Sequence, residues 1–349
     1  MNVLVAMSGG VDSSVAAAEL LDAGHDVVGV TMKLWGGDSD TGCCSVADVD
    51  DARRVAQQLG IDHLVFNFGD DFEEHVVAPY LQAHVAGATP NPCIECNRHL
   101  KFARLADRAD LLGFDAVATG HHARVVPPPN GSQTWRLARG ADRAKDQSYV
   151  LHMLGQRDLR RALFPVGAMT KDEVRRRAAS RGLRTAAKAD SQDVCFITTA
   201  RGRSGFVVSR VALHAAAVVD TSGRRVGQVP AVELVTVGQR RGVGLPGGGE
   251  VRYVVDVDVP AARVVVGSWK ELLVDDQRVG ACTWVDAPVE GPILAQCSAH
   301  GEVLPAVLDP GAEGAVLRWL TRQRRVAPGQ SVVFYDPGDE HVLGGGIAA

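Results

Sequence analysis

A glycine pair between an apolar run and a helical pattern constrains this chain more than any other feature of its sequence. The run Val3–Ala6 leads into Met7-Ser8-Gly9-Gly10-Val11-Asp12-Ser13-Ser14, and a helical pattern continues to Ala23. Glycine lets backbone N–H groups approach an anion closely, and the amino end of the next helix adds unpaired N–H groups and a positive dipole. The sequence therefore predicts a phosphate-binding turn between a strand and a helix. A turn that binds nothing would have the same pattern.

This turn differs from the common nucleoside triphosphate loop, because no Gly-Lys-Ser/Thr ending follows it. It resembles the PP-loop of the ATP pyrophosphatases, Ser-Gly-Gly-Val-Asp-Ser-Ser. That resemblance implies that ATP is cleaved to AMP and pyrophosphate and that the AMP activates an oxygen. It also implies that Asp12 faces the pyrophosphate, with Mg²⁺ as an expected cofactor, although an aspartate here is equally typical of a plain helix cap.

The first 125 residues alternate short apolar runs with helical patterns, which predicts an α/β domain with a parallel sheet covered on both faces. The apolar runs are Val3–Met7, Val27–Met32, His63–Phe68 and Ala116–Gly120. The helical patterns are Ser14–Ala23, Val46–Leu59, Phe72–Val85 and Arg98–Leu112. Ligands of such sheets bind at the carboxyl ends of the strands, where Ser8–Ser14, Met32 and Gly120-His121 would meet.

After about Phe206 the chain consists of short β-branched segments between Gly, Pro and Asp clusters. These segments are Ala215–Val219, Val232–Val237, Tyr253–Val257, Arg263–Val266, Ala315–Trp319 and Ser331–Tyr335. Such spacing is typical of all-β structure, with 246–249 as a glycine-rich loop. We expect a catalytic domain over residues 1–200, a small β-rich central domain over 201–265 and a C-terminal β-barrel over 266–349.

Composition is that of an ordinary globular protein, with 46% hydrophobic and 22% charged residues, and it predicts neither disorder nor a membrane span. The motif begins so near residue 1 that a signal peptide has no room before it, so we expect a cytoplasmic protein. Seven cysteines, an odd number, favour reduced thiols over a disulfide framework.

The net charge of −4 conceals a basic segment. Between Arg157 and Lys188 the chain carries ten basic side chains and three acidic ones. A cluster of this kind is typical of a surface that binds a phosphate backbone, and also of a solvated arginine-rich helix face.

Two cysteine segments carry the candidate redox chemistry. Asn91-Pro92-Cys93-Ile94-Glu95-Cys96-Asn97 is expected in a loop before a helix, whose positive end would lower thiol pKa values. Cys195 lies in Asp190-Ser191-Gln192-Asp193-Val194-Cys195-Phe196. For the remaining cysteines a packing role is expected; they are Cys43, Cys44, Cys282 and Cys297.

Read with its neighbouring blocks, the chain resembles the bacterial tRNA-specific 2-thiouridylases over nearly its whole length. The blocks are Thr89-Pro90-Asn91-Pro92, Cys96-Asn97, Lys101-Phe102, Ala118-Thr119-Gly120-His121, Lys145-Asp146-Gln147-Ser148-Tyr149, Phe164-Pro165-Val166-Gly167, Asp190-Ser191, Cys195-Phe196-Ile197, Thr236-Val237-Gly238-Gln239-Arg240-Arg241-Gly242, Pro328-Gly329-Gln330 and Leu343-Gly344-Gly345-Gly346. The resemblance implies an adenine-nucleotide hydrolase-like (Rossmann-like) catalytic domain that makes 2-thiouridine at the tRNA wobble position.

The resemblance also implies a role for individual residues. Cys195 would carry a persulfide supplied by a sulfur-carrier protein, and Cys96 would release the sulfur by forming a disulfide with it. ATP would contact Ala6, Met7, Ser8, Gly9, Gly10, Val11, Asp12, Ser13, Met32 and Gly120. The tRNA and its target base would contact Asn91, Pro92, Cys93, His121, Lys145, Asp146, Gln147 and Gln330, although His121 also fits a core histidine.

Two positions depart from the better-known members of that family. They carry an aspartate where this chain has Cys93, and an Arg-Tyr pair that contacts tRNA has no match around 298–301. With Cys93, the thiols of Cys96 and Cys195 make a set of three that could hold a 4Fe-4S cluster instead of a persulfide relay. Two other functions remain open: another PP-loop adenylating enzyme, which needs no cysteine pair, and a tRNA-binding module without activity.

Overall fold

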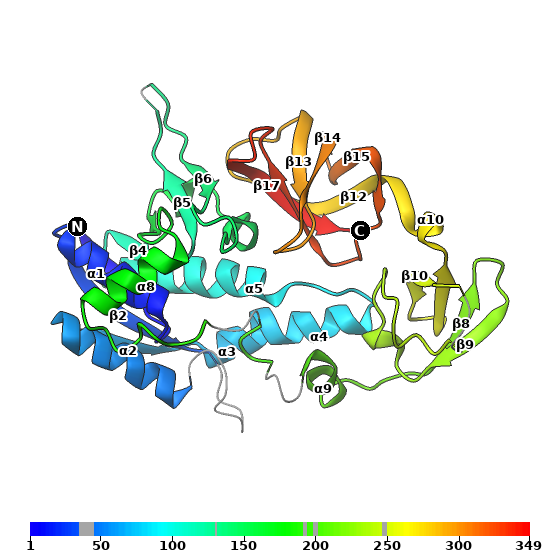
Figure 1. The fold of residues 1–349 in the computed structure, drawn as a ribbon, viewed down its shortest axis with the longest axis horizontal. Helices are drawn as coiled ribbons and strands as arrows, with labels where there is room; N and C mark the ends of the chain where they lie inside the picture. The colour runs from blue at the N-terminus through cyan, green and yellow to red at the C-terminus, as the bar shows by residue number, and fades with distance from the viewer. Residues whose placement is uncertain (35–44, 130, 191–193, 198–201, 246–249) are drawn as a thin grey trace.

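The computed structural model describes residues 1–349 except 35–44, 130, 191–193, 198–201 and 246–249 (Figure 1). Our predictions for Cys43, Cys44 and the glycine-rich loop 246–249 lie outside the described residues.

A five-stranded sheet, parallel throughout, forms the first part of the chain and confirms the predicted α/β class. In spatial order its strands are β3 (His63–Asn67), β2 (Asp26–Lys33), β1 (Asn2–Ala6), β4 (Ala116–Ala118) and β7 (Ala162–Leu163). The four apolar runs predicted from the sequence are strands β1 to β4. Because each βα unit returns to the same sheet edge, the loops after β1, β2 and β4 meet there.

Helices cover both faces of this sheet, as alternation along β1 illustrates. Val3 and Val5 pack in one apolar cluster with α1 (Val11–Asp22), α2 (Val46–Leu59) and α8 (Lys171–Ser180). Leu4 points to the other face and packs with a second set of helices. That set is α3 (Gly69–Phe72), η1 (Glu73–Val77), α4 (Ala78–Val85), η2 (Cys96–Arg104), α6 (Leu105–Leu111) and α9 (Gly202–Val208).

The helix that carries the first cysteine pair begins earlier than predicted. We expected 91–97 to be a loop, but α5 (Pro92–Glu95) starts at Pro92 and continues into η2 without a break. The side chain of Asn91 caps it by accepting a hydrogen bond of 3.0 Å from the amide of Cys93, and proline suits the first helical position. The Asn-Pro pair is therefore a helix start, and Cys93 and Cys96 lie one turn apart on the helix.

The central part is a four-stranded sheet in the order β10 (Tyr253–Asp258), β11 (Arg263–Gly267), β8 (Ala216–Asp220) and β9 (Arg225–Val229). One predicted strand, Val232–Val237, is wrong, since this segment contains the 3₁₀ turn η4 (Val232–Leu234). Three residues per turn place Val232 and Val235 on one side, where both are buried in the core of this sheet.

The last part is a closed six-stranded antiparallel barrel, as predicted. Its strands in spatial order are β12 (Leu273–Trp284), β15 (Gly314–Arg324), β14 (Val303–Gly311), β13 (Gly291–Gln296), β16 (Ser331–Tyr335) and β17 (His341–Ala348), and β17 pairs back onto β12. The hairpin β5 (Ala123–Val126) and β6 (Arg136–Arg139) comes from the first 200 residues but pairs with β17. The short helices η3 (Ser148–Leu151) and α7 (Gln156–Leu159) follow this hairpin, and α10 (Trp269–Leu272) precedes the barrel.

Among the described residues, no helix has both the length and the apolar character needed to cross a lipid bilayer.

Candidate active site

The predicted phosphate-binding turn connects β1 to α1 at the carboxyl edge of the parallel sheet. Gly9 has a φ of +71°, which favours glycine, and Gly10 stands at the cap position of α1. The hydroxyl of Ser13 accepts a hydrogen bond of 3.3 Å from the amide of Ser8, and that of Ser14 donates one of 2.8 Å to the carbonyl of Gly10. These two hydrogen bonds of Ser13 and Ser14 therefore hold the turn at the amino end of α1.

Two glycines of the site are required by close packing. A Cβ on Gly9 would lie 2.3 Å from the backbone oxygen of Asp48 in α2. A Cβ on Gly120, just after β4, would lie 2.6 Å from the amide nitrogen of Ser13. The loop after β4 therefore sits directly against the turn after β1, as the position of both at one sheet edge predicted.

Asp12 is the centre of an ion-pair network that the sequence analysis did not identify. Lys171, the first residue of α8, donates to both carboxylate oxygens of Asp12 at 2.8 and 2.7 Å. His122 Nε2 lies 3.0 Å from Oδ1 of the same carboxylate, so the ring donates there. Lys171 Nζ also lies 3.0 Å from Asp190 Oδ1. α8 lies alongside α1 in Figure 1, which brings these residues together from distant parts of the chain.

The carboxylates of this network stay ionised. Burial favours the neutral form of Asp12, but hydrogen bonds from His122 and Lys171 outweigh it, and its pKa is lower than usual. At Asp190 burial is likewise outweighed by Lys145 and Lys171, so its pKa is held well below the ordinary range. The only sequence signal for Lys171 was its place in the basic segment and at a helix start.

The two candidate catalytic thiols belong to one apolar cluster on the face of the sheet opposite α1. Cys96 is 8% exposed within that cluster, and Cys195 is half-buried and packs against it. Phe196, the residue after Cys195, belongs to the same cluster and makes edge-to-face contacts with Phe72 and Phe206, at centroid distances of 5.4 and 5.1 Å. The fold therefore brings the segments of Cys96 and Cys195 into a shared core, although a long stretch of sequence separates them.

The cysteines expected to have a packing role do pack. Cys282 and Cys297 contribute to the apolar cluster of the barrel. Burial raises the pKa of Cys282, and it raises the pKa of Cys297 to about 12. Such thiols are protonated and unreactive at neutral pH.

Among the candidate tRNA contacts, Lys145, Asp146 and Gln147 have partners within the protein. Lys145 Nζ lies 2.8 Å from Asp190. The side chain of Asp146 is 5% exposed and binds Arg139 at 2.7 Å. Gln147 Oε1 accepts a hydrogen bond of 2.9 Å from the amide of His122. These three side chains therefore make hydrogen bonds and ion pairs inside the protein, next to the turn after β1.

His121 and Gln330 are also engaged. His121 is buried, with Nδ1 2.6 Å from the Thr119 hydroxyl, and burial and Lys101 keep its pKa well below the usual value. The amide nitrogen of Gln330 donates to the carbonyl of Thr89, in the segment before Asn91. The barrel thus contacts the chain that leads into α5.

Most of the basic segment is neutralised by acids of the same domain. Seven of its ten basic side chains form ion pairs, several of them with α1 and α2: Arg161 with Asp110, Lys171 with Asp12, Arg175 with Asp190, Arg177 with Glu19, Arg181 with Asp22, Arg184 with Asp51, and Lys188 with Asp48 and Asp51. The other three, Arg157, Arg160 and Arg176, form no ion pair within the described part of the chain. Most of the basic side chains in this segment therefore link elements of the protein to one another, and only part of their positive charge is available to an anionic partner.

No group of three or more His, Cys, Asp or Glu side chains arranged to hold a metal ion occurs within the described residues. Cys93, Cys96 and Cys195, all of them described, do not form such a ligand set here. Both oxygens of Asp12 accept hydrogen bonds from Lys171.

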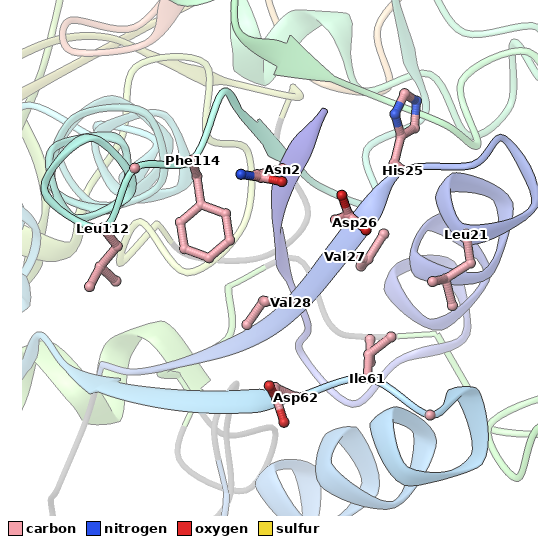
Figure 2. Close-up of a pocket in the computed structure, with 12 residues that line it drawn as sticks. Asn2, Leu21, His25, Asp26, Val27, Val28, Ile61, Asp62, Leu112 and Phe114 are labelled. Atoms are coloured by element: carbon pink, nitrogen blue, oxygen red, sulfur yellow. The ribbon is translucent and has the colours of Figure 1, made fainter.

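A shallow hollow lies at the opposite, amino edge of the sheet (Figure 2). It is lined by Asn2, Leu21, His25, Asp26, Val27, Val28, Gly60, Ile61, Asp62, Leu112, Gly113 and Phe114. None of the predicted site residues lines it.

Three family models together match almost the whole chain. They describe a tRNA methyl transferase HUP domain over residues 1–199, a tRNA methyl transferase PRC-barrel domain over 204–268 and an aminomethyltransferase beta-barrel domain over 275–348.

Curated relatives match over their full length. The tRNA-specific 2-thiouridylase MnmA of Chloroflexus aurantiacus is 48% identical over 360 residues, which cover 100% of this chain and 98% of the relative. Those of a Roseiflexus species and of Mycobacteroides abscessus are each 46% identical, covering 99% of both chains.

Proposed function

Because the chain belongs to the tRNA-specific 2-thiouridylase family, we propose that it is a tRNA-uridine 2-sulfurtransferase that uses ATP. The observation that carries this proposal is the joint presence of a glycine turn at the start of α1 and two thiol segments in one cluster of the same domain. A PP-loop enzyme that only adenylates needs the first feature and not the second.

The first half of the proposed reaction is activation. The uridine C2 oxygen attacks the α-phosphate of ATP, the bond to the β-phosphate breaks, and pyrophosphate leaves. Backbone N–H groups of the turn after β1 and the positive end of α1 suit the departing anion. Ala6–Ser13, Met32 and Gly120 are proposed to surround the nucleotide. The C2 oxygen then leaves as part of AMP, a far better leaving group than oxide.

The second half is sulfur transfer. The outer sulfur of a persulfide on Cys195 attacks C2, and the C2–oxygen bond breaks to release AMP. The thiolate of Cys96 then attacks the Cys195 sulfur, the sulfur–sulfur bond breaks, and the sulfur stays on C2 while a Cys96–Cys195 disulfide forms. An external thiol reduces this disulfide, and a persulfide sulfur-carrier protein reloads Cys195. The disulfide itself stays a prediction.

The remaining assignments belong to the same proposal. Asn91, Pro92, Cys93, His121, Lys145, Asp146, Gln147 and Gln330 are proposed to position the tRNA or its target base, some of them through the internal hydrogen bonds described above. Residues 1–200, 201–265 and 266–349 are proposed as the catalytic, central and barrel domains.

Replacement of either thiol tests the proposed relay. We expect Cys96→Ser and Cys195→Ser each to abolish formation of 2-thiouridine, while tRNA affinity stays within a few-fold of wild type. Cys297→Ser, in the barrel, is the matched control and should retain activity. The wild type should release AMP and pyrophosphate. Full thiolation by Cys96→Ser or Cys195→Ser, or release of ADP and phosphate, would contradict the proposal.

A cluster on Cys93, Cys96 and Cys195 is the second candidate, and Cys93 separates it from the relay. Better-known members carry aspartate at this position, so the relay predicts that Cys93→Asp remains active. A three-cysteine cluster would lose a ligand and its activity. Iron and sulfide analysis after anaerobic purification provides an independent measurement, and stoichiometric iron would favour the cluster.

A further inference from the structure

Five charged side chains form a compact group beside the turn after β1, and the proposed chemistry assigns a role to few of them. We name Lys145, Lys171, Arg175, Asp12 and Asp190 the ion-pair cluster. Asp190 accepts from all three cations, at 2.8 Å from Lys145, 3.0 Å from Lys171 and 2.7 Å from Arg175. Lys171 bridges the two carboxylates, since it also binds Asp12.

Lys171 occupies the place in this cluster that matters most to an anion. Asp12 lies in the first turn of α1, so the ammonium held by its carboxylate stands at the positive end of that helix. The side chain of Lys171 is only 11% exposed, and its backbone amide is fixed by a hydrogen bond of 2.9 Å to Asp142. A nearly buried ammonium needs negative partners, and here two carboxylates provide them.

Within the ion-pair cluster three cations face two carboxylates, the carboxylate of Asp142 lies beside Lys171 and Lys145, and His122 adds a further donor to Asp12. Asp190 is its more exposed carboxylate, at 35% of its side chain, and it belongs to a loop rather than to a helix or strand. Its carboxylate therefore neutralises cations that a more highly charged anion could bind in its place.

We propose that Lys171 contacts the phosphates of the nucleotide and that Asp190 is an internal anion that competes with those phosphates for it. The inference rests on the proposed binding of ATP at the turn after β1. When pyrophosphate or the ATP phosphates occupy the turn, Lys171 exchanges its bond with Asp190 for one with a phosphate oxygen, and Lys145 and Arg175 become available to the same anion.

The two sides of this competition predict effects of opposite sign. Calorimetric titration of the full chain with inorganic pyrophosphate, and separately with ATP, is the measurement. Lys171→Met should weaken binding about tenfold or more, as expected for loss of a charge-assisted bond. Asp190→Asn should tighten it several-fold, because the competing carboxylate is gone. A purely structural cluster would make both variants bind more weakly.

Controls separate this inference from the function on which it rests. Lys270→Met removes an exposed lysine of α10 and should bind as wild type does. Lys171→Arg keeps the charge and should bind within a few-fold of wild type, and melting temperatures show whether Lys171→Met is folded. If the wild type binds neither pyrophosphate nor ATP, the proposed function fails. If the wild type binds and Lys171→Met or Asp190→Asn binds equally well, or if Asp190→Asn binds more weakly, this inference is overturned.

Discussion

His152 shows how a single buried residue couples this fold to pH. It is 1% exposed, neither ring nitrogen has a hydrogen-bond partner among the described residues, and a Cβ on Gly345 would lie 2.6 Å from its Nδ1. Burial, with the nearby charge of Arg98, lowers the pKa of His152 to about 3. An unfolded chain would protonate the ring near pH 6.5, so acid favours the unfolded state between those two values.

We therefore expect His152→Leu to flatten the loss of stability in mild acid. Between pH 6.5 and 4.5 the folded wild type keeps the ring neutral while the unfolded chain gains a proton, which costs up to about 1.4 kcal/mol per pH unit. Urea unfolding of both proteins across this range measures the slope. His25→Leu, at the hollow of Figure 2, is the control. Parallel slopes for wild type and His152→Leu would contradict the assignment.

At the scale of elements, α8 is held to α1 by charge as well as by packing. Arg177 pairs with Glu19 of α1 and with Glu173 of its own helix, and Arg181 pairs with Glu19 and Asp22. Val174 and Ala178 of α8 are buried in the same cluster as Val15 of α1. The basic segment therefore divides into arginines that join helices and arginines that form no ion pair within the described residues.

This division predicts which arginines bind RNA. Replacement of Arg157, Arg160 and Arg176 by alanine should weaken tRNA binding and flatten the plot of log affinity against log salt, because each lost phosphate contact removes about one unit of slope. Arg177→Ala should leave that slope unchanged and lower stability by about 1 kcal/mol at most, since exposed ion pairs contribute little. An unchanged slope in the triple variant would mean that tRNA binds another surface.

At the scale of the whole molecule, the barrel and the first domain are joined by specific contacts. Arg139 of β6 lies between Asp146 and Asp339, at 2.7 Å from each, and stacks 3.6 Å from the ring centroid of Tyr335. A second contact is the loop 328–330, where the amide of Thr89 donates to the carbonyl of Pro328 at 2.9 Å. Figure 1 shows the barrel beside the hairpin of β5 and β6.

Gly329 tests the second contact. It has a φ of +86°, and a Cβ there would lie 3.0 Å from the Thr89 nitrogen. Gly329→Ala should therefore lower the free energy of unfolding by more than Gly223→Ala, whose glycine has a φ of +85° with open space around it and isolates the backbone strain of about 1 kcal/mol. Faster hydrogen exchange at the Thr89 amide should accompany it. An equal loss of unfolding free energy in the two variants would show that the loop 328–330 accommodates the added methyl group without displacing Thr89.

The sequence by itself determined the strand, turn and helix around Gly9 and Gly10, the parallel sheet and the barrel, because these follow from local periodicity and from backbone conformations that few residues adopt. Two other segments also depend on local sequence but were predicted wrongly. Helix capping by Asn91 makes 92–95 a helix and not the expected loop, and core packing makes Val232–Leu234 a 3₁₀ turn and not the expected strand.

Only the tertiary structure decided which charges meet. Asp12, His122, Lys171 and Asp190 come from separate segments, and an ion pair depends on distances of a few ångströms that a linear pattern does not encode. The same holds for the basic segment, because most of its basic side chains pair with acids from other segments, α1 and α2 among them. Net charge along a sequence adds without regard to position, whereas electrostatic energy depends on which side chains the fold brings into contact.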